Sequence, residues 1–264
     1  MNSDTDKLRF ERVLNEVLLT GRDRTGIGTY QEKMLHSAVK LFICDDKSCH
    51  EVKIYPDTPG KTGGRESGYI ADILIDCDIY EIQTGGFFPL KPKIKFYLEE
   101  TSYNVTVVVP LAARKWVSWI DPDTSEVSKR HRSPKKQSPR DILPELFWLL
   151  PYINSRRLSF RVLLLEIDEF RLRNGWGNDG KRGSERYERI PRGLCGIEDF
   201  SVPADYIPLL PEGLPDTFTA AEFGKAARLR GRKIYSVIKV FLELGLLKTD
   251  GMRGRAVLYR LSVK

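Results

Sequence analysis

The sequence contains few cysteines, and none of them form a close pair. The 264 residues include four, Cys44, Cys49, Cys77 and Cys195, with no CxxC spacing. This pattern is not that of a disulfide framework or of a four-cysteine zinc site. We expect reduced, buried thiols, as in a cytosolic protein. Cys44, Cys49 and His50 lie close enough in sequence to share a zinc ion, although no fourth ligand is apparent beside them.

Long apolar segments are also absent. The longest apolar runs, residues 105–113 and 162–165, are far too short to cross a bilayer. Residues 1–9, MNSDTDKLR, lack the apolar stretch of a signal peptide. The chain has no internal repeat and no low-complexity tract. We therefore expect a cytoplasmic protein with no membrane partner.

The composition is that of a globular protein with a basic surplus. Hydrophobic residues make up 41% of the chain and charged residues 30%, which excludes wholesale disorder, collagen and coiled coil. A chain of 264 residues is long enough for two domains. Lys and Arg number 43 against 36 Asp and Glu, a net charge of +7. A surplus of this size favours a polyanionic partner.

The hydrophobic periodicity predicts an alternation of helices and strands. The expected helices are residues 7–19, 29–42, 90–98 and 142–152, the second beginning at Thr29 with Glu32 as its capping-box partner. The expected strands are residues 50–55, 104–110, 115–120 and 160–170, together with a hairpin over 69–84. This order predicts an α/β fold, a mixed sheet flanked by helices.

The hairpin carries two carboxylates that the pleat should bring together. If the turn is Asp76-Cys77, then Asp72 lies opposite Glu81 on one face, and Gln83 joins that face two residues further along. Two carboxylates this close repel each other unless a cation lies between them, and Mg²⁺ accepts such ligands. Cys77 is unusual in a tight turn that favours Gly or Asn, so a turn displaced by one residue, which would break this pairing, remains an alternative.

These motifs resemble the PD-(D/E)XK nuclease superfamily. Its core runs helix, strand, hairpin with Asp and ExK, helix, strand, and the same order is expected here over roughly residues 26–115. The segment ADILIDCDIYEIQ is particularly similar to competence-type (CoiA-like) nucleases, which also carry ExQ. The resemblance implies a restriction-endonuclease-like fold and metal-dependent phosphodiester hydrolysis.

The resemblance also assigns roles to individual residues. Asp72 and Glu81 would bind Mg²⁺ or Mn²⁺, and Glu32 matches an acidic residue that some branches place on the first helix. Gln83 stands where the usual Lys orients the attacking water; it departs from the family pattern because Gln offers hydrogen bonds and no charge. His36 lies one turn after Glu32, on the same helix face, as a further candidate for the site or for a simple hydrogen-bonded neighbour.

Basic residues gather in two other places. One is a loop over residues 129–140, and the other is a C-terminal part whose helix, turn, helix and hairpin pattern is that of a winged helix, with residues 233–244 as recognition helix. The first helix of this part is expected over residues 217–229, with Thr219 as N-cap and Glu222 as its capping-box partner. Such residues bind phosphates and release counterions. The predicted nucleic-acid contacts are Lys129, Arg130, Arg132, Lys135, Lys136, Arg232, Lys233, Ser236, Arg253 and Arg255.

The sequence thus predicts three parts. Residues 1–192 would form the nuclease-like domain, with its core at about 26–170; residues 193–215 a linker; and residues 216–264 a small winged-helix domain. The expected function is metal-dependent hydrolysis of nucleic acid, DNA more than RNA. The alternative is a non-catalytic DNA-binding or regulatory protein with a degenerate nuclease core. A homodimer is left open.

Overall fold

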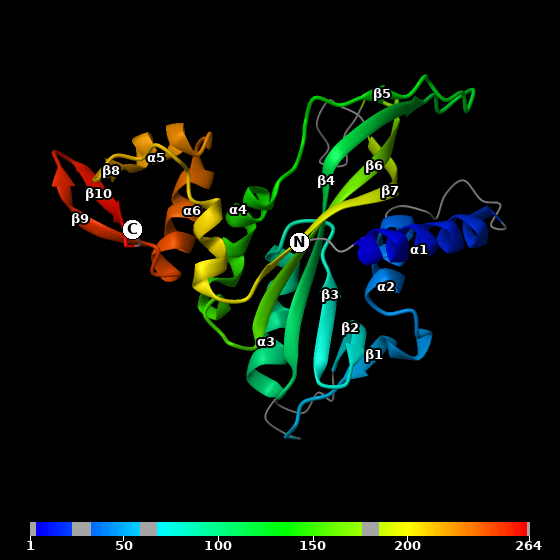
Figure 1. The fold of residues 1–264 in the computed structure, drawn as a ribbon, viewed down its shortest axis with the longest axis horizontal. Coiled ribbons are helices and arrows are strands. Elements are labelled where there is room, and N and C mark those ends of the chain that lie inside the picture. Colours follow the sequence, from blue (N-terminus) through cyan, green and yellow to red (C-terminus); the bar gives the residue numbers. More distant parts are fainter. Residues whose placement is uncertain (1–3, 23–32, 59–67, 176–184, 263–264) are drawn as a thin grey trace.

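A seven-stranded mixed sheet organises the first 200 residues. The computed structural model describes residues 4–22, 33–58, 68–175 and 185–262 (Figure 1). The strand order is β1-β2-β3-β4-β6-β7, with β5 paired to β4. The predicted α/β fold is confirmed. The strands are β1 (His50–Ile54), β2 (Tyr69–Ile75), β3 (Asp78–Ile82), β4 (Asn104–Ile120), β5 (His131–Arg132), β6 (Leu158–Leu172) and β7 (Glu185–Phe200).

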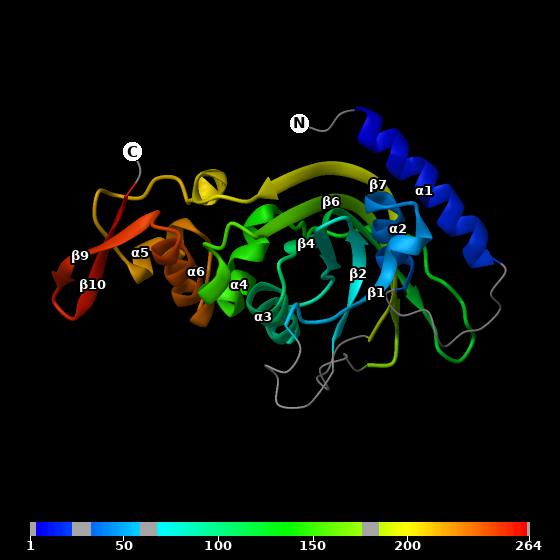
Figure 2. The ribbon, with the colours of Figure 1, turned by 90° about the horizontal axis from the view of Figure 1, so that it is seen from below.

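Helices cover both faces of this sheet because its central strands are parallel and apolar on both sides. β3 pairs with β4, and β4 with β6, in parallel. The α3 helix (Lys91–Glu100) makes the crossover from β3 to β4 and packs on one face. α1 (Asp4–Arg22) and α2 (Lys33–Ile43) pack on the other, where Figure 2 shows α1 lying across β7. Two apolar clusters, one on each face, therefore hold the sheet.

Two strands differ from those that the sequence predicts. β4 is one strand of 17 residues, where two strands were expected. β7 runs through residues expected to be irregular, so the predicted linker over 193–215 is wrong for its first eight residues, 193–200. Pro191 and Gly193 weaken the strand signal there, but β7 lies at the sheet edge, where Pro is tolerated, and register shifts against β6 absorb the irregularity.

Short helices connect the sheet to the C-terminal part. Tyr206 and Leu209 of η5 are buried, so this connection packs into the protein after β7 ends. Residues 142–152, predicted to be helical, are helical, as the last residue of η3 followed by α4 and η4 rather than as one continuous α-helix. The short elements are η1 (Lys47–Cys49), η2 (Phe88–Leu90), η3 (Pro139–Ile142), α4 (Leu143–Leu146), η4 (Phe147–Tyr152) and η5 (Pro203–Leu209).

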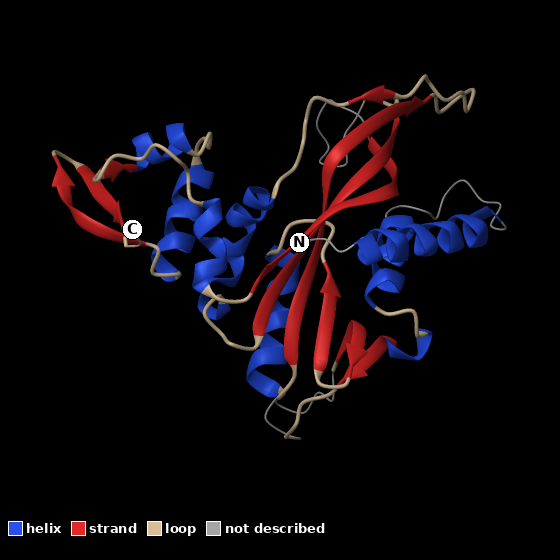
Figure 3. Cartoon of the chain, viewed as in Figure 1, coloured by secondary structure: helices blue, strands red, loops and turns tan. Residues whose placement is uncertain are grey.

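The C-terminal residues have the expected winged-helix arrangement (Figure 3): two helices and then a hairpin, with a short strand β8 completing a three-stranded sheet. The capping box is confirmed, because the Glu222 N–H donates to Thr219 Oγ1 at 3.3 Å and the Thr219 N–H donates to Glu222 Oε2 at 2.6 Å. The elements are β8 (Phe218–Thr219), α5 (Ala220–Ala226), α6 (Arg232–Glu243), β9 (Leu247–Arg253) and β10 (Ala256–Leu261).

The winged-helix part packs directly on the sheet domain. α6 contacts α4 and η4, and one continuous apolar cluster includes both Val107 of β4 and Phe241 of α6. The Asn154 side chain adds a hydrogen bond to the Glu243 carbonyl oxygen at 2.8 Å. None of the helices in the described ranges is long and apolar enough to span a membrane.

Arg157 gives a direct test of how the fold is fastened. Its guanidinium donates to the carbonyl oxygens of Leu98, Thr101 and Tyr103, at 2.7 Å and 3.0 Å for the last two, and so ties the end of α3 to the start of β4. Arg157→Ala should lower the free energy of unfolding by roughly 2 kcal/mol, because these carbonyls lose a charged donor. Urea denaturation measures it. The exposed neighbour variant Arg156→Ala should stay within about 0.5 kcal/mol of wild type; equal losses in both would contradict this role.

Candidate functional site

The β2–β3 hairpin has the register predicted from the sequence. Ile73 pairs with Tyr80, and Ile75 with Asp78, so the turn is Asp76-Cys77. The positive φ of 51° falls on Asp76, a residue type that tolerates it, and not on Cys77. The displaced turn is therefore excluded. Continued by one step, this register sets Asp72 opposite Glu81.

Asp72 lies where the backbone pairing of the hairpin ends. The last backbone pair on this side is Ile73 with Tyr80, and beyond it the Ile82 N–H donates to Asp72 Oδ2 at 2.7 Å. His36 Nε2, from α2, lies 3.4 Å from the same oxygen. The Asp72 carboxylate thus replaces a strand carbonyl and joins the hairpin to α2. His36, the candidate for the site or for a simple hydrogen-bonded neighbour, therefore lies beside Asp72.

Glu81 is buried in the centre of the site, with 2% of its surface exposed. Lys93 Nζ lies 2.6 Å from Glu81 Oε2, and the Tyr97 hydroxyl donates to Oε1 at 3.0 Å. Both partners come from α3, four residues apart, and therefore share one face of the helix. Neither was predicted. The available signal was their i,i+4 spacing in the helix that directly follows the EIQ motif.

The environments of the two carboxyl groups shift their pKa values in opposite directions. Burial raises the pKa of Glu81 to about 7; Lys93 opposes the shift, and the negative charge of Asp72 adds to it. Burial also acts to raise the pKa of Asp72, but the hydrogen bond and charge of His36, with help from the Ile82 N–H, bring it below its ordinary value. Asp72 is therefore the charged member of the pair near neutral pH, while Glu81 exchanges its proton there.

The other two predicted catalytic residues are placed differently. Gln83 follows the end of β3; its Nε2 donates to the Gly86 carbonyl oxygen at 2.6 Å, within its own loop. Glu32 lies outside the described residues. The structure therefore brings together Asp72, Glu81 and His36 from the predicted set and adds Lys93 and Tyr97 to them.

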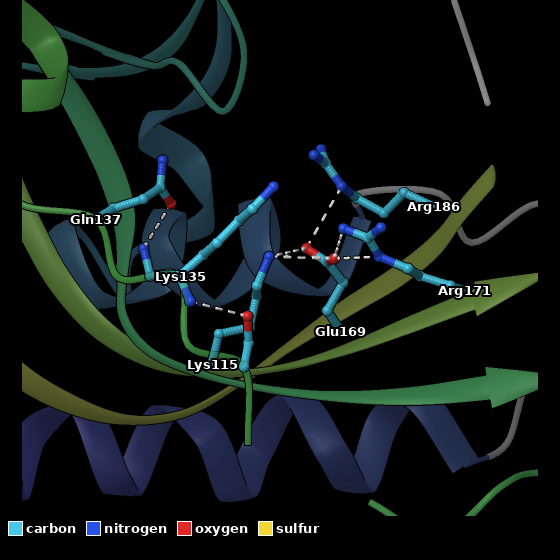
Figure 4. Close-up of polar contacts among 8 residues, drawn as sticks. Lys115, Lys135, Gln137, Glu169, Arg171 and Arg186 are labelled. Atoms are coloured by element: carbon cyan, nitrogen blue, oxygen red, sulfur yellow. Dashed lines mark hydrogen bonds and ion pairs between the residues drawn. The ribbon is translucent and has the colours of Figure 1, made fainter. Parts of the chain in front are cut away.

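A cluster of basic side chains lies on the extended part of the sheet. Figure 4 shows Lys115, Arg171 and Arg186 directed at Glu169. Lys115 Nζ is 3.3 Å from each carboxylate oxygen, Arg171 Nε donates to Oε1 at 2.6 Å, and Arg186 Nε is 3.6 Å from Oε2. Glu169 is buried, and these cations, Lys115 first, hold its pKa below the ordinary value against the effect of burial. One ionised carboxylate thus fixes three cations on the sheet.

This cluster is connected to the loop after β3. Arg189 of β7 pairs directly with Glu169 of β6, and its Nη2 donates to the Thr84 carbonyl oxygen at 3.4 Å. Thr84 follows Gln83 in the chain. The long strands therefore bring basic side chains from β4, β6 and β7 toward the hairpin that carries the two carboxylates.

The predicted basic loop is partly built into the sheet. Arg130 donates from Nε to Asp168 Oδ1 at 2.8 Å and lies over the Trp116 ring at 4.2 Å, so it anchors the loop. Arg132 belongs to β5 and pairs with Trp116. The remaining predicted contacts of this loop, Lys129, Lys135 and Lys136, are exposed.

The predicted recognition helix, α6, packs against the rest of the protein on its apolar sides. α6 packs against α5 and β9 on one side and against α4 and η4 on the other. Arg232 and Ser236 line a hollow between α6 and the α4–η4 segment, while Lys233 is exposed. Arg232, Lys233 and Lys239 stay exposed on α6, so the polar face expected of helix 233–244 is present, and its contact with nucleic acid stays a prediction.

In the wing, the two predicted arginines differ. Arg253 forms an ion pair with Glu222 at 2.9 Å, whereas Arg255 is exposed at the hairpin tip. Arg253 therefore also fastens the wing to the first turn of α5.

The cysteines are free thiols, as expected, but only Cys44 is buried, and Cys77 is exposed in the hairpin turn. Cys44 Sγ contacts the Asp46 carbonyl oxygen at 3.6 Å, and His50 Nε2 lies 2.9 Å from the Cys44 carbonyl oxygen. Within the described ranges, no group of three or more His, Cys, Asp or Glu side chains is arranged as a metal site.

The fold is thus a mixed α/β domain with two carboxylates on a hairpin, followed by a winged-helix part. A protein-family model, Domain of unknown function (DUF8091), matches residues 33–200. This is more than half of the chain, and the protein belongs to that family. The matched segment begins where α2 begins and ends where β7 ends. No curated protein and no solved structure matches the chain.

The raised pKa of Glu81 has a consequence for stability. Between pH 4.5 and about 7 the unfolded carboxyl is ionised while the folded one keeps its proton, so wild-type stability should fall as pH rises through this window. The loss should reach at most roughly 3 kcal/mol. Glu81→Gln removes this titration. The difference in unfolding free energy between wild type and Glu81→Gln should therefore change by most of that amount from pH 5 to pH 7.5.

The measurement is urea denaturation across this pH range. Asp72 contributes a slope of the opposite sign, but only below its ordinary pKa of 3.8, outside the window. Parallel stability curves for wild type and Glu81→Gln would show that Glu81 titrates like an exposed carboxyl.

Proposed function

We propose that this protein is a metal-dependent nuclease whose site is formed by Asp72 and Glu81. The observation that carries the proposal is the pairing of these carboxylates on adjacent strands, one held by His36 and the other by Lys93, with pKa values displaced in opposite directions. The resemblance to PD-(D/E)XK nucleases supports the same reaction. DNA is the proposed substrate ahead of RNA.

The donor set fits a hard divalent cation. Asp72 and Glu81 offer carboxylate oxygens, which Mg²⁺ and Mn²⁺ prefer. The charge of Asp72 helps to raise the pKa of Glu81, and a cation held by both groups would relieve that repulsion. When bound, the ion would supply positive charge for the phosphate oxygens and lower the pKa of a coordinated water.

Lys93 supplies a charge that the Gln83 position lacks. Its ammonium group is 2.6 Å from Glu81 and acts on the pKa of Asp72 as well. A cation held at this point by a buried carboxylate is pre-oriented, so it can stabilise negative charge that develops on a phosphoryl group. We therefore assign to Lys93 the electrostatic role that the family pattern gives to the Lys of ExK, while Gln83 shapes the loop through Gly86.

The basic side chains around Glu169 support a nucleic-acid substrate. Arg171 and Arg186 remain 31% and 44% exposed while they contact Glu169, so phosphate oxygens can approach them. Through Arg189 and Thr84 this cluster adjoins the loop after β3. Lys135 and Lys136 extend the same basic character.

Cleavage of a panel of labelled DNA and RNA, single- and double-stranded, with Mg²⁺ or Mn²⁺ tests the proposal. Asp72→Asn and Glu81→Gln should each lower the cleavage rate at least a hundredfold, because each removes a metal ligand. The matched control is Asp78→Asn on the same hairpin, whose carboxylate accepts only from Asn104 at 2.9 Å; it should cleave like wild type. Metal-independent cleavage would contradict the proposed metal site, and no cleavage with binding intact would favour the non-catalytic alternative.

Lys93→Gln provides a separate prediction. Loss of the ammonium should lower kcat by roughly a hundredfold, the cost of removing one pre-oriented electrostatic group. The pKa of Glu81 should also rise further, because Lys93 opposes its shift, so the acidic limb of the rate profile should move to higher pH. Lys95→Gln, an exposed lysine on the same helix, is the control. Equal effects from both variants, or an unshifted pH profile, would contradict the role of Lys93.

A further inference from the structure

A hollow of about 400 Å³ lies between the η4 segment of the sheet domain and the first turns of α6. Three aromatic rings line it, Phe147, Trp148 and Tyr235, together with the cations Arg232 and Lys239. Its walls thus come from both parts of the protein, which are fixed to each other by the shared apolar cluster. The volume lies within the range of small-ligand sites.

The rings at this hollow are unusually exposed for their size. Tyr235 is 59% exposed and Trp148 is 37% exposed. Trp148 is held edge-on by Phe88 at 4.8 Å and by Phe147 at 5.6 Å, so its orientation is fixed although the ring is open to solvent. Clustered exposed rings indicate a binding surface, because a folded protein rarely leaves so much aromatic area in water without a use.

The charge of the hollow is of one sign. No acidic residue is among those that line it. Within the described parts of the chain, neither Arg232 nor Lys239 forms an ion pair, and Lys239 Nζ lies 5.6 Å from the centre of the Phe147 ring. Lys239 and Arg232 also lie seven residues apart on one helix, two turns along the same face. The hollow therefore offers flat apolar surfaces beside two cations.

We propose that this hollow binds an unpaired nucleotide of a single-stranded nucleic acid. The base would stack on Tyr235 and Trp148, and its phosphates would be held by Arg232 and Lys239. Stacking on aromatic rings with cations along the backbone is how proteins bind single strands without reading sequence. A continuous duplex cannot offer its base faces in this way. The packing of α6 against α4 and η4 creates this site.

This inference is independent of the nuclease proposal, because binding here requires neither a metal ion nor cleavage. The experiment is fluorescence anisotropy of a labelled oligothymidylate with the full chain in EDTA. Tyr235→Ala should weaken binding about tenfold, as expected for loss of one base stack. Tyr235→Phe keeps the ring and should bind like wild type. Trp148→Ala should weaken binding by a similar factor.

Two controls separate stacking from general charge attraction. Tyr55→Ala removes an exposed ring that also lies near a lysine, Lys53 of β1, at 4.9 Å, but directly after β1; it should leave binding unchanged. An abasic oligomer should bind wild type and Tyr235→Ala with equal affinity. The affinity for a blunt duplex should fall less than twofold in Tyr235→Ala. Lys239→Ala should reduce the slope of log affinity against log salt by roughly 0.7.

Two outcomes would overturn the proposal. In the first, Tyr235→Ala and Trp148→Ala bind the single strand as wild type does. In the second, they weaken duplex and single-strand binding equally, which would point to a charged surface without base stacking. Because all readouts are made in EDTA, neither outcome bears on cleavage at Asp72 and Glu81.

Discussion

The buried contact between Glu81 and Lys93 depends on the central topology of this protein and explains its candidate site. β3 and β4 are parallel, so the chain must cross over between them, and α3 makes that crossing. A helix in this position places one row of its side chains over β3. Lys93 and Tyr97 belong to that row, and Glu81 lies beneath them. A carboxylate buried at such a place must find donors or remain protonated. Glu81 accepts hydrogen bonds from Lys93 and Tyr97, and its pKa is nevertheless raised to about 7, so it gains or loses its proton near neutral pH.

Asp72 has a structural role in the hairpin beside the role proposed for it in the site. Its carboxylate accepts a hydrogen bond from the Ile82 N–H where the strand pairing stops. This bond holds the Asp72 side chain beside β3, next to the residue that follows Glu81. His36 then connects the carboxylate to α2. The site is thus held by three elements, the hairpin, α2 and α3. A cation bound by Asp72 and Glu81 would remove the repulsion between these two carboxylates. Without the cation, His36 and Lys93 offset that repulsion.

Local sequence signals predicted the hairpin, its register and the Thr219–Glu222 capping box, because each depends on residues close together in the chain. Alternation placed Asp72 opposite Glu81 without knowledge of the sheet. Lys93 could not be assigned this way, since its partner is twelve residues away and the contact exists only once the crossover forms. The sequence did not predict β7, because its Pro, Gly and alternating charges are typical of a loop. The segment becomes a strand because it pairs with β6. The burial of α6 against η4 depends on packing between domains, which periodicity does not report.

The central claim is that Asp72 and Glu81 form one site for a divalent cation. The most direct test is an NMR titration of the Glu81 side-chain carboxyl carbon, assigned by comparison with Glu81→Gln, with and without Mg²⁺. The account predicts a midpoint at about 7 in the metal-free protein and a clear downward shift on adding Mg²⁺, abolished by Asp72→Asn. A midpoint that is unchanged by Mg²⁺ would contradict it.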